Sequence, residues 1–101
     1  MSNTKNTIQS DQLLGRLVVS RAGHDKGTLL CVLATDGEYL MLADGRRRKV
    51  QAPKRKKKKH VTLINTAAYS GTQSNKALRS FIRAAMQTAE YTQPAQTENA
   101  Y

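Results

Sequence analysis

Between residues 13 and 64, short apolar runs alternate with turn-forming residues. Two Asp-Gly pairs, Asp36-Gly37 and Asp44-Gly45, are the strongest hairpin signals, because glycine adopts a positive φ without a Cβ clash. Turn signals about ten residues apart favour a small antiparallel barrel or sandwich over alternating strands and helices. The pattern predicts five strands, at residues 17–19, 29–33, 39–42, around 47–50, and 60–64, with Pro53 interrupting the ladder before the last one.

The hydrophobic periodicity changes after residue 64. Apolar residues then recur at the spacing of one helix face, at Leu78, Phe81, Ile82, Ala85, Met86 and Ala89. This spacing predicts an amphipathic helix over 74–90, with Ser74 or Thr72 as its N-cap. The small size of the chain favours packing of this helix on the barrel, where it completes a small core. The alternative is that the helix docks on a protein partner such as a ribosomal protein.

The predicted organisation is one mainly β domain with a C-terminal α-helix. The barrel covers residues 13–65 and includes a basic loop at 46–59, and a linker of small and polar residues follows at 66–73. The segments 1–12 and 91–101 are polar and are predicted to be disordered tails. The first of them has no apolar stretch typical of a secretory signal, and no window of the chain has the apolar length of a membrane helix.

Composition adds a strong positive charge to this picture. The 101 residues include 17 Lys and Arg against 7 Asp and Glu, which gives a formal net charge of +10. A field of that sign attracts polyanions, and nucleic acid is the first candidate. With 39% apolar residues the core must be small. A chain of 101 residues is long enough for a binding module but short for an enzyme with a water-excluding active site.

Ten of the basic residues lie in two blocks, 46–49 and 54–59, and no acid interrupts either block. A phosphate backbone is the natural partner of such a run, because each neutralised phosphate releases a counterion. The alternatives are a solvated charged loop or a nuclear-import signal beginning at Pro53. No aromatic residue lies between Tyr39 and Tyr69, which favours recognition of phosphates and shape in structured RNA over stacking of single-stranded bases.

A second motif precedes the second predicted strand. Gly15 and the apolar Val18 are followed by Gly23-His24-Asp25-Lys26-Gly27, and a strand with apolar residues comes after it. This order resembles the KOW motif of ribosomal proteins and transcription elongation factors. The later Asp44-Gly45-Arg46, the Lys-rich run and the final predicted strand are similar to the KOW-domain RNA-binding proteins of the ribosome. The resemblance covers roughly residues 14–64, about half of the chain.

The resemblance implies an SH3-like β-barrel of about five strands that binds ribosomal or other structured RNA. It also implies that the loop at 21–27 and the basic strands and loops contact RNA. His24 stands where a lysine is common, which weakens the charge of that loop. The predicted RNA-binding residues are Arg21, His24, Lys26, Arg46, Arg47, Arg48, Lys49, Lys54, Arg55, Lys56, Lys57, Lys58 and Lys59.

Other chemistry finds little support in the sequence. His24 and His60 have no second cysteine or acidic cluster near them, so no zinc site is expected. Cys31 lies inside an apolar run and is predicted to be a buried core residue rather than a nucleophile. Aspartates in turns usually satisfy backbone amides. We therefore expect no catalytic residues and no cofactor.

The sequence predicts a cytoplasmic, non-enzymatic protein that binds structured RNA, most specifically ribosomal RNA, and that has no membrane partner. The alternative is a transcription or translation adaptor whose barrel mainly binds a protein. DNA also stays open as a ligand, because a phosphate contact carries little sequence or sugar identity.

Overall fold

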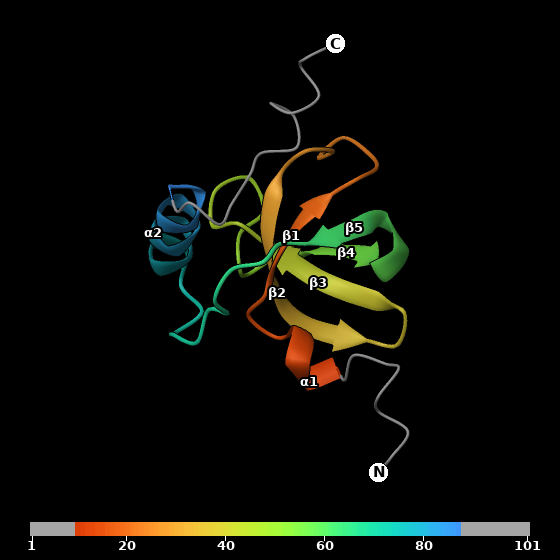
Figure 1. Ribbon diagram of the computed structural model, residues 1–101, viewed down its shortest axis with the longest axis horizontal. Coiled ribbons are helices and arrows are strands. Elements are labelled where there is room, and N and C mark those ends of the chain that lie inside the picture. Colours follow the sequence, from red (N-terminus) through yellow and green to blue (C-terminus); the bar gives the residue numbers. More distant parts are fainter. Residues whose placement is uncertain (1–9, 88–101) are drawn as a thin grey trace.

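The computed structural model describes residues 10–87, and it confirms a mainly β fold with one C-terminal helix (Figure 1). The predicted tails lie outside these residues, except for 10–12. The elements are α1 (Ser10–Leu13), β1 (Leu17–Ser20), β2 (Leu29–Asp36), β3 (Tyr39–Ala43), β4 (Lys54–Lys57), the 3-10 helix η2 (Lys58–His60), β5 (Val61–Leu63) and α2 (Asn75–Met86).

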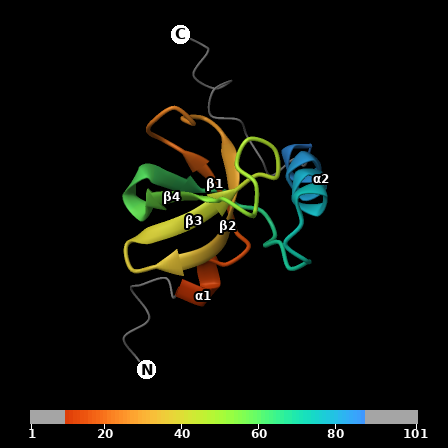
Figure 2. The same cartoon turned by 180° about the vertical axis from the view of Figure 1, so that it is seen from behind.

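The five strands form one antiparallel sheet in the order β4-β3-β2-β1-β5. Its two edge strands, β4 and β5, are joined directly by the three residues of η2. Lys58 N donates to Glu38 O at one end of this connection, and at the other end His60 O accepts from Arg21 N. The sheet therefore curls so that its two edges approach each other (Figures 1 and 2). Full closure of the sheet into a barrel stays a prediction.

Both faces of the central strands are buried, which explains their continuous apolar runs. Odd-numbered residues such as Leu17 and Cys31 join an outer cluster, whereas Val18 and Leu30 join an inner cluster. The inner cluster lies within the curl of the sheet and includes Leu13 from α1. The outer cluster is covered by α2 through its buried residues Leu78, Ile82 and Ala85. The apolar face of α2 therefore packs on the sheet, as predicted from the small size of the chain.

Two predicted elements are wrong. The fourth strand is not 47–50 but β4, which lies inside the Lys-rich block and begins directly after Pro53. The ladder β3–β4 pairs Leu42 with Lys54 and Leu40 with Lys56, so tertiary pairing overrides the low strand propensity of lysine. The predicted basic loop 46–59 accordingly divides into a loop at 44–53 and a strand. Residues 10–12, predicted as tail, belong to α1, whose Leu13 is buried in the inner cluster.

The two Asp-Gly pairs have different structural roles. Asp36-Gly37 forms the tight β2–β3 hairpin, as predicted, with Asp36 paired to Tyr39. Asp44-Gly45 instead opens loop 44–53, in which Asp44 Oδ1 accepts from the backbone N of both Arg46 and Arg48 at 2.9 Å. The loop is fixed to α2, which it borders in Figure 2: Val50 N donates to Asn75 Oδ1, and Arg79 donates to Gly45 O. Ser74 is the N-cap of α2, because its side chain accepts from Ala77 N.

Gly45 is expected to be irreplaceable at this junction. It has φ +80°, and a Cβ built on it would overlap the Asn75 carbonyl oxygen. Gly45→Ala should therefore lower the free energy of unfolding by about 2 kcal/mol, because backbone strain and displacement of α2 add together. Gly37→Ala is the matched control, since Gly37 has φ +63° but open space around its Cβ position. Chemical denaturation of both variants measures the difference, and equal losses would contradict the steric argument.

Candidate nucleic-acid interface

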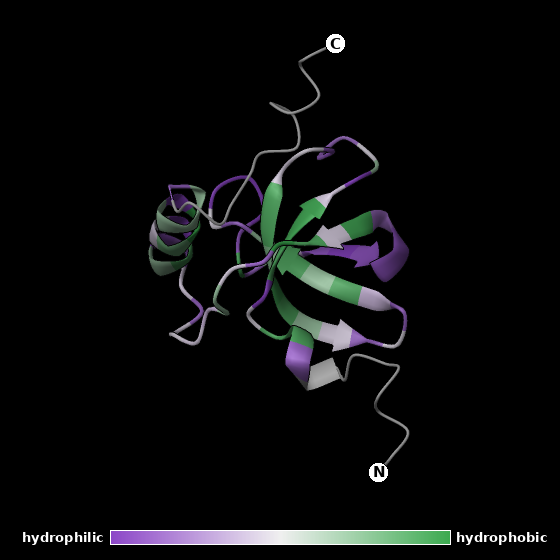
Figure 3. Ribbon diagram, in the orientation of Figure 1, coloured by the Kyte–Doolittle hydropathy of each residue, from purple (hydrophilic) through white to green (hydrophobic). Residues whose placement is uncertain are grey.

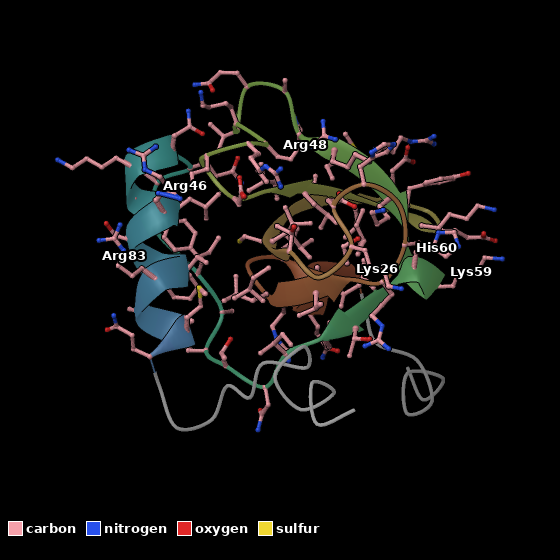
Figure 4. All side chains as sticks on the ribbon, turned by 90° about the horizontal axis from the view of Figure 1, so that it is seen from above. Lys26, Arg46, Arg48, Lys59, His60 and Arg83 are labelled. Atoms are coloured by element: carbon pink, nitrogen blue, oxygen red, sulfur yellow. The ribbon has the colours of Figure 1, made fainter. Side chains whose placement is uncertain are left out.

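The loops 21–28 and 44–53 come together at one end of the sheet. An open pocket of about 240 Å³ lies between them and is lined by His24, Asp25, Thr28, Asp44, Arg47 and Arg48. Loop 21–28 and the first basic block, 46–49, which are distant in sequence, thus border one surface. Figure 4 shows Arg46 beside α2, Arg48 along the loop, and Lys26, Lys59 and His60 further across the same view.

The acids of this end are turned inward. Asp44 is 8% exposed and holds the backbone of its own loop. Asp25 is 7% exposed and accepts from Ser20 Oγ at 2.9 Å. The neighbouring Arg46 and Arg47 side chains are exposed. At this end of the sheet, the acidic side chains are therefore buried and the basic side chains face solvent.

Lys56 is the exception among the predicted RNA-binding residues. Its side chain is only 7% exposed, and its Nζ donates to Ala22 O at 2.9 Å and lies 3.2 Å from Asp25 Oδ1. Burial raises the pKa of Asp25, but the Ser20 hydrogen bond and the Lys56 ammonium outweigh it and lower that pKa below its ordinary value of 3.8. The Lys56 ammonium is therefore committed to loop 21–28, which counts against the predicted phosphate contact by this residue.

The other predicted contact residues keep their side chains at the surface. The Lys-rich segment continues from β4 through η2, so its cations follow the curved edge of the sheet rather than a free loop. Those that are exposed are Arg21, His24, Lys26, Arg46, Arg47, Lys49, Arg55 and Lys59, and those that are half-buried are Arg48, Lys54, Lys57 and Lys58.

Sequence reasoning missed an aromatic partner of the basic strand. Tyr39 is opposite Lys57 in the β3–β4 ladder, and its ring centroid lies 3.7 Å from Arg55 Cζ. Lys57 Nζ lies 5.8 Å from the same centroid. The basic run itself contains no aromatic residue, but strand pairing places Tyr39 of β3 next to it. Only the correct position of the fourth strand could have revealed it.

Cys31 is fully buried, as predicted, and desolvation raises the pKa of its thiol to about 12, so it stays protonated. Across residues 10–87, no group of three or more His, Cys, Asp or Glu side chains is placed to hold a metal ion. The helices in this part of the chain are too short or too polar to cross a membrane.

The chain matches no protein-family model and no curated protein.

Proposed function

We propose that this protein is a non-enzymatic RNA-binding protein that recognises structured RNA through phosphates and shape. One observation carries the proposal: at the end of the sheet formed by loops 21–28 and 44–53, the cations face solvent and the acids are buried. A cationic surface that spans two loops and a strand matches a backbone of regularly spaced phosphates.

The rigidity of this surface supports structured RNA as the ligand. The loop 44–53 is held by Asp44 and by α2, and the loop 21–28 is held by Lys56. Loops whose backbone is already held lose little conformational entropy on binding when the phosphates they meet are also fixed. Ribosomal RNA is an abundant ligand of this kind, and the KOW-like order of motifs supports it. The specific form of the proposal is therefore a cytoplasmic protein associated with the ribosome.

Crosslinking in cells tests this proposal. The RNA crosslinked to the protein is recovered and sequenced, and ribosomes are sedimented in parallel at low and high salt. We expect crosslinks concentrated in one structured region of ribosomal RNA and a co-sedimentation that salt abolishes. Crosslinks that are diffuse or absent, with the protein retained on a protein partner at high salt, would contradict RNA binding and favour the adaptor function.

A further inference from the structure

The outer face of the β3–β4 pair is a second surface, distinct from the pocket between the loops. Leu40 and Leu42 point into the inner cluster, so the alternation of β3 places Tyr39 and Met41 on the opposite face. The register then places Arg55 and Lys57 beside them. In Figures 1 and 2, α2 lies on the other side of the molecule from the β2–β3 hairpin. Figure 3 shows the hydrophilic β4 next to the more hydrophobic β3.

Arg55 is held in a defined position on this face. Its Cζ lies 3.7 Å from the centroid of the Tyr39 ring, so the ring covers one face of the guanidinium. Its NH2 lies 3.7 Å from Asp36 Oδ2, in an ion pair whose side chains are 54% and 70% exposed. An ion pair this exposed adds little stability, so the stack on Tyr39 is the main restraint. With its side chain 54% exposed and Tyr39 on one side, Arg55 remains accessible to a ligand.

We propose that Arg55, stacked on Tyr39, is a binding site for one unpaired nucleobase of the RNA. A guanidinium plane stacks on a base as an aromatic ring does, and its charge also attracts the adjoining phosphate. Lys57, on the same face, supplies a second cation for that phosphate. The site rests on the proposed function and narrows its substrate class to structured RNA with a bulged or looped-out nucleotide beside a helix.

Three RNA hairpins test the site. One has a single unpaired adenosine in its stem, the second has an abasic residue at that position, and the third is fully paired. We expect the protein to bind the first about 10-fold more tightly than either of the others, the size of one base stack. Arg55→Lys keeps the positive charge but loses the planar guanidinium. It should therefore abolish the preference for the unpaired adenosine and leave the salt dependence of binding unchanged.

Variants of neighbouring residues complete the experiment. Tyr39→Phe keeps the ring and should keep the preference, whereas Tyr39→Leu should reduce it, because the guanidinium loses its support. Lys76→Arg, at an exposed position of α2 outside the proposed interface, is the control and should change neither quantity. Thermal unfolding confirms that each variant is folded.

The outcomes separate this site from the proposed function. Equal, salt-sensitive binding of all three hairpins would overturn the base site and leave RNA binding intact. A preference that survives Arg55→Lys would also overturn it, because another residue would then hold the base. Weak binding of every hairpin that does not respond to salt would contradict the proposed function itself.

Discussion

Replacing Lys56 with methionine is expected to lower the free energy of unfolding by about 3 kcal/mol, although methionine fits a strand and fills a similar volume. The substitution leaves the Asp25 carboxylate buried without its counter-charge, and breaking one partner of a buried pair costs this much. In a domain of this size the melting temperature should fall by roughly 12–24 °C. Differential scanning calorimetry at neutral pH measures the change.

Lys57→Met is the matched control for this experiment. It removes the same charge from the next position of β4, but Lys57 lies on the outer face and is only half-buried. Its effect should stay within about 0.5 kcal/mol, as for most surface substitutions. Similar losses in the two variants would mean that general repulsion in the Lys-rich run, and not the pair with Asp25, dominates stability.

The ion pair between Lys56 and Asp25 also makes the free energy of unfolding depend on pH. The folded pKa of Asp25 is below its ordinary value of 3.8, so the folded state favours the ionised carboxylate. This contribution is present above pH 3.8 and is lost as the pH falls through the lower, folded pKa. In Lys56→Met the loss of the ammonium should raise that pKa, so the variant should lose less stability than the parent protein on acidification.

Replacing Arg46, Arg47, Arg48 and Lys49 together with serine is expected to weaken binding of structured RNA by about 100-fold at moderate salt. Each phosphate contact contributes about 0.7–0.9 to the slope of log affinity against log salt, so the slope should fall by about 3. The fold should persist, because Asp44 holds this loop through the backbone N of Arg46 and Arg48. Filter binding or fluorescence anisotropy over a salt series measures both quantities.

Lys76→Ser/Arg83→Ser is the control for charge removal. Both side chains are exposed on α2, and Figure 4 shows Arg83 on the helix, away from Lys26 and Lys59. This control should lower the slope of log affinity against log salt by less than the contribution of one phosphate contact, about 0.7–0.9. If the slope falls in proportion to charge in both variants, the protein attracts RNA through its net charge and has no defined interface.

The elements predicted correctly from the sequence are those that a few neighbouring residues decide. The β2–β3 hairpin follows from Asp36-Gly37, the helix from its apolar spacing, and the N-cap from Ser74. Each of these is decided within a few residues, by a positive φ, a helical stripe or a single hydrogen bond.

The fourth strand could not be predicted in the same way. Lys54–Lys57 has no apolar alternation and a high like charge, and it becomes a strand because β3 offers an unpaired edge next to it. Two features of the candidate site depend on that pairing. Lys56 reaches Asp25, and Arg55 reaches Tyr39, only after the register is set. Strand pairing over a long sequence separation therefore decides which cations are free to bind.

Because the two apolar clusters are separate, α2 and the curled strands should differ in the free energy of local opening. Neighbouring residues of β1 and β2 point into different clusters, so the clusters share a backbone layer but no side chains. Loss of α2 would expose the outer cluster and leave the inner cluster closed around Val18 and Leu30. The helix can thus open as a separate cooperative unit, below the cost of global unfolding, while amide protons of the curled strands remain protected from exchange.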